Sequence, residues 1–442
     1  MMRRQDKHFW STLPLALALC LLVGMLAACG AAGGYGTIPP MVVLSSVGNT
    51  GDTTSSGSLW DKTLMVVPEE IPQEALGGEE ALCCGVGANN RLLMLSETAV
   101  WLYDSETEER LPLLPGNSET EAYLRLILTN MGEDAEQLPA EELLNRLIAV
   151  RFAAEPTMLK NPAYCEQRSG VWLYLGLAES IPCLVDTRSG LFYSERDHRY
   201  VDGSDSQIFR MSVAFESPDL YDLESGTTLP FLLVNFGGGR RPTAYSCGFL
   251  PDGGKYVVLF KNGQLHLELL TADGKSEQYE LGNFWLRYLG GFKMVWPVGD
   301  TAVLVSGQQS NGLSPHITVL IDRLSGTVSL LWMENLRLES APLSEFLDEK
   351  GNVRFPEEWN GSTAIFPISA LEDGKTALLY YGSSPSLALF RPESMELKTI
   401  LNSPGVGEKL RPELVYGGDE LLVNQKSHEL LRLQEIGAYA SY

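Results

Sequence analysis

The sequence predicts an all-β fold built from repeated four-stranded antiparallel sheets. Residues 243–282 give the first observation, with four short runs of β-branched, aromatic or alternating residues and three tight turns. The turns hold Asp-Gly-Gly at 252–254, Asn-Gly at 262–263 and Asp-Gly at 273–274. These pairs favour hairpins because glycine accepts a positive φ freely and Asn or Asp tolerates it. A four-stranded meander of about 40 residues is the size of one β-propeller blade.

Two repeated turns are the second and third observations. Asp-x-x-Ser-Gly occurs at residues 186–190, 222–226 and 322–326, each time between two apolar strands. In this outer turn the Asp carboxylate can accept turn amides, and the glycine can take the left-handed conformation. A second, inner turn occurs at 250–255 and 371–375, each time before an apolar strand.

Counting the outer turns predicts about seven blades. Six or eight blades are also compatible with the sequence, because the pattern of strands and turns is indistinct over residues 150–215. The turns fall near residues 104, 186, 222, 273, 322, 392 and 430. The first full blade is expected over residues 82–114. The last unit, 413–434, has no strong fourth strand, and the early strand at 64–67 could supply it and close the ring.

Two segments interrupt the strand pattern. A small helical insertion is expected near residues 118–150, where Ser118 to Glu121 is interpreted as a capping box and Pro139 as a helix start. The apolar positions expected on one face of each helix are Tyr123, Leu124, Ile127, Leu128 and Met131, then Leu143, Leu144, Leu147 and Ile148. A second insertion is expected over residues 334–360.

These turns carry a family resemblance. Residues 249–256, Phe-Leu-Pro-Asp-Gly-Gly-Lys-Tyr, resemble the Pro-Asp-Gly-Lys turn of WD40-like and TolB-like propeller repeats. The Asp-x-x-Ser-Gly hairpins are similar to the Asp-x-x-Thr-Gly turn of such blades. The resemblance covers about residues 81–437 and implies a fold rather than a function. Within these residues Trp-Asp and Gly-His pairs are absent, and the repeat spacing is uneven.

The N-terminus resembles a bacterial lipoprotein signal peptide. A basic segment, residues 1–7, precedes an apolar run, 13–28, and then Leu26-Ala27-Ala28-Cys29 matches the lipobox of Leu, two small residues and Cys. The resemblance implies cleavage between Ala28 and Cys29 and acylation of the Cys29 thiol. Two or three acyl chains hold a protein stably at a bilayer. The alternative is an uncleaved anchor, since residues 9–28 are nearly long enough to span.

The predicted organisation is a signal peptide over residues 1–28, a tether over 29–59 and the propeller domain over 60–442. The tether is rich in Gly, Ser, Thr and Ala. If unstructured, it would span roughly 30 Å. The chain would therefore be lipid-anchored on the extracytoplasmic face of a bacterial cell membrane.

The net charge of the chain limits which classes of macromolecule it can bind. The chain has 33 Lys and Arg against 56 Asp and Glu, a formal net charge of -23. Such a surface repels phosphate backbones, so nucleic acid is not expected as a partner. With 44% hydrophobic residues, the chain can bury a large core.

The cysteines left after Cys29 give no clear disulfide or metal pattern. Their number is odd, and their spacing matches no zinc motif. Cys83 and Cys84 are interpreted as core residues of a central strand, with a vicinal disulfide as the alternative. A pairing between Cys165 and Cys183 stays open, and the sequence suggests no pairing for Cys247.

No catalytic motif stands out. The sequence has no Gly-x-Ser-x-Gly, no His-Glu-x-x-His and no sialidase-type Asp box. The nearest approach to a nucleophile elbow, residues 382–385, is interpreted as a turn. The histidines are scattered, and His266 on an alternating strand is interpreted as structural or solvent-facing. No catalytic, cofactor or metal residues are therefore predicted, and enzymatic activity is left undecided, with the balance against it.

Three loops have compositions that bear on ligand binding. Residues 235–241 combine glycines with Arg240 and Arg241 and could cradle an anion, although an ordinary inter-blade connection is favoured. Residues 197–205 concentrate carboxylates but miss calcium-loop spacing. Residues 360–362 fit a glycosylation acceptor without expected meaning in a bacterial chain.

The predicted function is a binding or scaffolding module of the bacterial cell envelope, with a protein, peptide or glycan partner. One alternative is an envelope-polymer hydrolase or lyase that uses acidic residues converging on the propeller funnel. Another is a sensory partner of an envelope signalling system.

Overall fold

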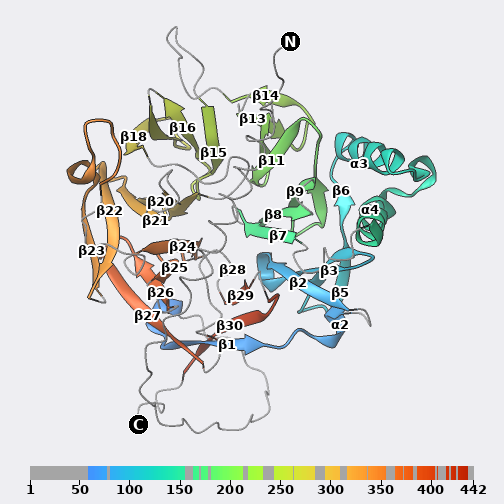
Figure 1. Ribbon diagram of the computed structural model, residues 1–442, viewed down its shortest axis with the longest axis horizontal. Coiled ribbons are helices and arrows are strands. Elements are labelled where there is room, and N and C mark those ends of the chain that lie inside the picture. The colour runs from blue at the N-terminus through green and yellow to red at the C-terminus, as the bar shows by residue number, and fades with distance from the viewer. Residues whose placement is uncertain are drawn as a thin grey trace, which may run out of the picture. The chain divides into compact units, whose positions relative to one another are not determined.

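The computed structural model forms a ring of seven blades, each built on four antiparallel strands (Figure 1). The blades make six hydrogen-bonded sheets, because the last strands of blades six and seven pair in parallel and join these two blades into one eight-stranded sheet. It describes residues 58–76, 80–154, 163–168, 171–177, 181–212, 218–231, 243–261, 263–283, 294–308, 316–335, 337–354, 364–371, 373–381, 386–403, 406, 415–417, 420–424 and 427–436. The predicted signal peptide and all but the end of the predicted tether lie outside these residues.

The first six blades each use four strands in chain order. Blades one and two contain β2 (Ala81–Val86), β3 (Leu92–Ser96), β4 (Val100–Asp104) and β5 (Glu109–Pro112), then β7 (Ala163–Gln167), β8 (Trp172–Leu177), β9 (Ile181–Asp186) and β10 (Leu191–Tyr193). Blades three and four contain β11 (His198–Gly203), β12 (Gln207–Ser212), β13 (Pro218–Asp222) and β14 (Thr228–Pro230), then β15 (Thr243–Phe249), β16 (Lys255–Lys261), β17 (Gln264–Leu270) and β18 (Ser276–Gly282). Blades five and six contain β19 (Val295–Val298), β20 (Ala302–Gln308), β21 (His316–Asp322) and β22 (Thr327–Glu334), then β24 (Ile365–Ala370), β25 (Ala377–Tyr381), β26 (Ser386–Arg391) and β27 (Glu396–Asn402).

The seventh blade is completed from the other end of the chain. Its first three strands are β28 (Val415–Gly417), β29 (Leu421–Asn424) and β30 (Leu430–Glu435), and its fourth is β1 (Leu64–Glu69). β1 runs antiparallel to β30, with Val66 opposite Leu433, and Figure 1 shows the two side by side. This confirms both the count of seven blades and the predicted closure of the ring.

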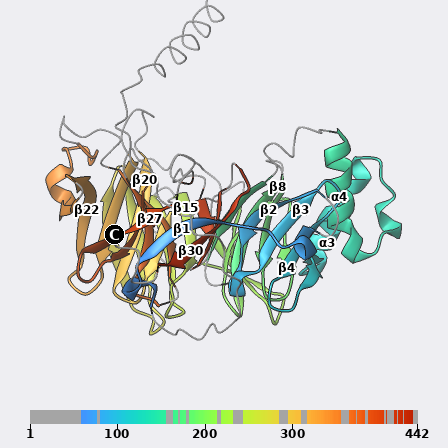
Figure 2. The same cartoon turned by 90° about the horizontal axis from the view of Figure 1, so that it is seen from below.

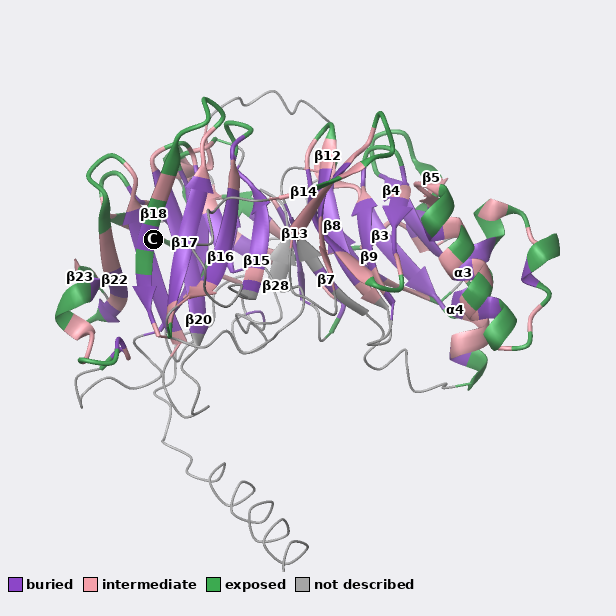
Figure 3. Ribbon diagram, turned by 90° about the horizontal axis from the view of Figure 1, so that it is seen from above, coloured by how far each residue is buried: buried purple, intermediate pink, exposed green. Residues whose placement is uncertain are grey.

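The core lies between blades rather than inside one sheet. Seven clusters of buried apolar side chains are found among the described residues, one at each junction, from blades one and two round to blades seven and one. At the closing junction Met94 of β3 packs in one cluster with Val423 of β29. Middle strands are therefore covered on both faces, and all five residues of β3 are buried. Figure 3 shows this buried interior with exposed turns at its ends.

The outer turns have the predicted geometry. The carboxylate of Asp322 accepts the amide of Leu324 at 2.9 Å and the hydroxyl of Ser325 at 2.6 Å, and the amide of Gly326 bonds the carbonyl of Asp322. Gly326 has a φ of 73°, as the left-handed position requires. The turns that start at Asp186 and Asp222 repeat these contacts.

One predicted outer turn was wrongly assigned. The turn near residue 430 joins the second and third strands of blade seven, with the amide of His428 bonded to the carbonyl of Asn424 at 2.7 Å. Because the fourth strand of this blade is β1, the blade has no turn between its third and fourth strands. The count of seven blades was correct although this turn was assigned to the wrong pair of strands.

The helical insertion lies outside blades one and two (Figure 2). It contains α3 (Ser118–Asn130), η3 (Ala135–Gln137) and α4 (Ala140–Ala154). The predicted apolar residues Leu124, Leu128, Leu143, Leu144, Leu147 and Ile148 are buried in the cluster between these blades. The predicted capping box was wrong by one residue: the side chain of Asn117, not Ser118, accepts the amide of Thr120 at 2.8 Å.

Blades five and two each have a fifth strand. The expected insertion after residue 334 begins with β23 (Arg337–Pro342), which extends blade five, followed by η5 (Leu343–Phe346). The predicted return strand over 110–114 ends at Pro112, and the separate strand β6 (Leu114–Pro115) pairs in parallel with β10 of blade two. The remaining short elements are η1 (Leu59–Asp61), α2 (Gln73–Leu76) and η2 (Ala88–Asn90).

Candidate functional site

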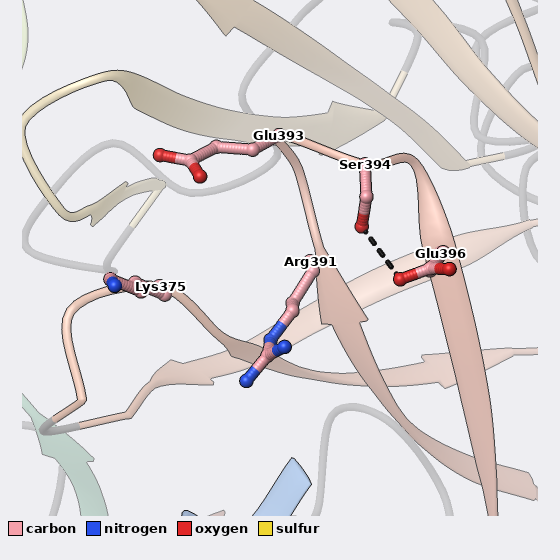
Figure 4. Close-up of a pocket in the computed structure, with 5 residues that line it drawn as sticks. All are labelled: Lys375, Arg391, Glu393, Ser394 and Glu396. Carbon is pink, nitrogen blue, oxygen red and sulfur yellow. Dashed lines mark hydrogen bonds between the residues drawn. The ribbon is translucent and has the colours of Figure 1, made fainter.

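A cavity of about 460 Å³ lies at the outer edge of blade six. Its lining comes from two turns of that blade: Lys375 from the inner turn between β24 and β25, and Arg391, Glu393, Ser394 and Glu396 from the outer turn between β26 and β27 (Figure 4). In an antiparallel sheet these two turns lie at the same end of the strands. We call this end of the ring the turn end, and the cavity the rim pocket.

Arg391 is held at the rim pocket by the first described residues of the chain. Its guanidinium carbon lies 4.5 Å from the ring centroid of Trp60 in η1, a cation–π contact. The Nζ of Lys398 donates to the carbonyl oxygen of Trp60 at 2.5 Å, and the hydroxyl of Ser58 donates to Asp373 at 3.2 Å. The start of the described chain is thus fixed beside the pocket.

The cations of the rim pocket have no partner anion within the described part of the chain. The Nε of Arg391 is buried without a hydrogen-bond partner there. Neither Arg391 nor Lys375 makes a side-chain hydrogen bond or ion pair with a described residue. Figure 4 shows Arg391 extending from the end of its strand and Lys375 on the inner turn beside it.

The carboxylates of the rim pocket are engaged by hydroxyl groups. Glu393 accepts from the hydroxyl of Thr301, in the neighbouring inner turn of blade five, at 3.2 Å. Glu396 accepts from the hydroxyl of Ser394 at 2.9 Å (Figure 4). Hydrogen bonds also fix the inner turn, because the carboxylate of Asp373 accepts the backbone amides of Lys375 and Thr376. Burial alone would raise the pKa of Asp373, but these hydrogen bonds have the larger effect, and the pKa is lowered. The pocket therefore has a rigid frame with two available cations.

A second polar group surrounds Glu195, just before β11. Its carboxylate bonds Nη1 of Arg210 at 3.0 Å, the hydroxyl of Tyr200 at 3.3 Å and Nδ1 of His198 at 3.2 Å. Burial raises the pKa of Tyr200, so the phenol stays protonated and donates. The group joins blade three to the start of α3, since Nδ2 of Asn117 donates to the Tyr200 oxygen.

The carboxylates of residues 197–205 do not converge on an ion. Asp202 is 2% exposed and accepts the amides of Gly203 and Phe249, which ties blade three to blade four. Asp205 pairs with Nη1 of Arg188 at 2.6 Å. Among the residues that the structure describes, no group of three or more His, Cys, Asp or Glu side chains could hold a metal ion.

The structure brings together one Ser–His pair that sequence spacing did not reveal. The hydroxyl of Ser306 on β20 lies 2.6 Å from Nε2 of His316 on β21, and also contacts the hydroxyl of Thr318 at 2.7 Å. Burial lowers the pKa of His316 to about 3, so the imidazole is neutral. Ser306 is only 5% exposed. We interpret the group as a buried polar network between strands, because a nucleophile must be accessible to substrate.

The other sequence candidates have structural roles or fall outside the description. His266 is 7% exposed and its Nδ1 lies 3.3 Å from Nε2 of Gln278, as expected for a structural histidine. Cys83, Cys84, Cys165, Cys183 and Cys247 are all buried thiols, which confirms the core interpretation of the first two. The structure does not describe Cys29 or the predicted cleavage point between Ala28 and Cys29. The same is true of three loops, residues 235–241, 360–362 and 382–385.

No helix among the described residues is both long enough and apolar enough to cross a bilayer. This finding concerns residues 58–436 with their gaps, and the predicted signal peptide precedes them.

Comparison with known proteins found no matching family model and no matching curated protein. The chain is similar to the solved β-propeller domain of Cps50 (Swd1) from Myceliophteria thermophila, with 12% identity, a TM-score of 0.40, and coverage of 84% of this chain and 100% of that one. It is also similar to a catalytically inactive virginiamycin B lyase from Staphylococcus aureus, with 10% identity, a TM-score of 0.29, and coverage of 63% and 96%. Both likenesses are distant, and the propeller fold is assigned from the strand order and the junctions between blades.

Proposed function

We propose that this protein is a lipid-anchored, extracytoplasmic β-propeller that acts as a binding or scaffolding module of the bacterial cell envelope. The observation that carries the proposal is the point where the chain enters the ring. The first described strand, β1, is the outermost strand of blade seven, and η1 before it packs at the turn end through Trp60. The described chain therefore enters the ring at the turn end, on an outermost strand rather than an inner one.

The opposite end of the ring is the proposed partner-binding side. It carries the turns between second and third strands and the connections between consecutive blades. The Glu195 group lies on one such connection, between β10 and β11. Loops placed on a rigid scaffold are the usual binding surfaces of propellers. With its net charge of -23, the chain favours a protein, peptide or glycan partner over nucleic acid.

Anchoring is tested on the full chain in a bacterial host. Mass spectrometry of the mature protein should find Cys29 as the first residue with acyl chains attached. The Cys29→Ser variant should lose the acyl label and leave the membrane fraction or remain unprocessed. An unmodified Cys29, or an intact Met1 on the wild-type chain, would refute the lipid anchor.

Partner binding is tested separately by chemical crosslinking on intact cells that express the full chain. The expected result is a discrete crosslinked macromolecule that is absent when an unrelated protein carries the same leader and tether. Capture of none, together with no ligand in a thermal-shift screen of envelope peptides and glycans, would contradict the binding role whatever the anchor result.

A further inference from the structure

We infer that the rim pocket is a binding site for a small phosphate-bearing ligand. The two cations that line it, Arg391 and Lys375, come from different turns and have no anionic partner within the described part of the chain. A guanidinium can bond two oxygens of one tetrahedral anion through its fork, and an ammonium can bond a third as a point charge.

The side chain of Arg391 is held in place before any ligand binds. The contact with Trp60 restrains the guanidinium, which lowers the entropy lost when a ligand binds. Its Nε is buried without a hydrogen-bond partner among the described residues. Because Nε is closed to solvent, a ligand would be bound by the two terminal nitrogens of the guanidinium, Nη1 and Nη2, which are not among the buried unpartnered atoms.

The size of the rim pocket indicates more than an inorganic ion. A cavity of about 460 Å³ falls in the range of small-molecule sites. The phosphate would lie between Arg391 and Lys375, and a small polar group such as glycerol would fill the rest. Hydroxyl groups of that moiety would reach Glu393 and Glu396, whose hydrogen bonds to Thr301 and Ser394 leave further acceptor capacity.

The phosphate could be a free monoester or a diester from a lipid headgroup or an envelope polymer. The two sources share the same chemistry but differ in charge and in the number of oxygens available. Glycerol phosphate represents the monoester, and glycerophosphoglycerol, a water-soluble headgroup, represents the diester. The site is built from described residues alone and is independent of the lipid anchor and of the partner-binding side.

Isothermal titration of the full chain in detergent micelles with each of these two compounds tests the inference. We expect binding of at least one compound, weakened about tenfold or more in Lys375→Gln, which removes one charge-assisted contact. The Lys350→Gln variant makes the same charge change at an exposed site in the connection between β23 and β24, and it should bind like wild type. Glu393→Gln should bind more tightly, because it removes a repulsive charge from the lining.

The role of Arg391 is tested with two variants, because its substitution also removes the cation–π contact with Trp60. Arg391→Gln should abolish binding, and Arg391→Lys, which keeps the charge but loses the fork, should restore only part of it. Thermal unfolding of each variant identifies any loss of structure. The Lys375 side chain makes no hydrogen bond or ion pair with a described residue, so the Lys375→Gln variant separates ligand binding from folding.

The compound that binds identifies the source. Lys375-dependent binding of glycerol phosphate alone supports a free monoester, and Lys375-dependent binding of glycerophosphoglycerol supports a headgroup or polymer. Absence of binding for both compounds, or equal binding by Lys375→Gln and Lys350→Gln, would overturn the inference. Neither result bears on membrane anchoring through Cys29 or on crosslinking to a macromolecular partner.

Discussion

Gly299 and Gly374 bring the inner turns of blades five and six into direct contact. Both have a positive φ, 62° and 64°. A β-carbon on Gly299 would clash with the carbonyl oxygen of Gly374. Neighbouring blades are therefore joined at the turn end by backbone contact as well as by their apolar faces.

The Gly299→Ala variant tests this contact. A positive φ costs an L-residue about 1–2 kcal/mol, and the clash adds roughly 1–3 kcal/mol of strain. The matched control is Gly326→Ala, where φ is 73° and a β-carbon would have no neighbour within 4 Å. Urea unfolding should show a clearly larger loss of unfolding free energy for Gly299→Ala. Equal losses would mean that the two turns do not touch.

Asp322 should stabilise its outer turn through its carboxylate. Asp322→Ala removes the bonds to the Ser325 hydroxyl and the Leu324 amide and should cost about 1 kcal/mol at neutral pH. The control is Leu324→Ala in the same turn, at a side chain that is 82% exposed, which should change stability by less than about 0.5 kcal/mol. Urea unfolding of both variants measures the difference, and equal effects would contradict the proposed role of the carboxylate.

The same carboxylate should make the turn sensitive to acid. The hydrogen bond from Ser325 and the backbone amides lower the pKa of Asp322 from its usual value of 3.8. The unfolded chain then binds the proton more readily, so the contribution is complete above that value and is lost as the pH falls below it. The loss of stability between pH 5 and pH 3 should be smaller in Asp322→Ala than in wild type.

His316 should make the fold less stable at mildly acidic pH. Burial lowers its pKa to about 3 from 6.5, so the unfolded chain binds the proton first. Stability is therefore complete above pH 6.5 and falls towards pH 3, by up to about 1.4 kcal/mol per pH unit for each proton. Burial also lowers the pKa of His428, which contributes in the same direction.

Unfolding measured between pH 7 and pH 4.5 isolates the histidines, because most carboxylates titrate below this range. The slope should be smaller in His316→Gln and smaller again in the double variant with His428→Gln. A slope identical to wild type in the double variant would show that neither imidazole is kept neutral by burial.

Local signals in the sequence predicted much of the fold. The Asp-x-x-Ser-Gly turns were recognisable because their hydrogen bonds join residues within five positions, as at Asp322 and Gly326. The cap at Asn117 was missed because Ser118 is an equally good capping residue one position later. Such ambiguity is resolved only by how the helix packs on the blades.

The sites were much less predictable. The contact between Ser306 and His316 depends on the register of β20 with β21, which a spacing of ten residues does not determine. The rim pocket combines Lys375 and Arg391 from two turns with Trp60 from the far end of the chain. No local sequence pattern predicts that these three residues lie together, because their proximity follows from the closure of the ring.

Disulfide trapping between β1 and β30 tests the closed seven-bladed ring most directly. Met65 lies opposite Gln434, and cross-strand partners have Cα atoms about 4.5–5.5 Å apart. Mild oxidation of the Met65→Cys/Gln434→Cys protein should give an intramolecular disulfide, detected by mass spectrometry of the linked peptides. The control Met65→Cys/Glu435→Cys, shifted by one residue to the other face of the strand, should give little. A disulfide absent from the first protein, or equally abundant in both, would contradict closure of the ring by β1.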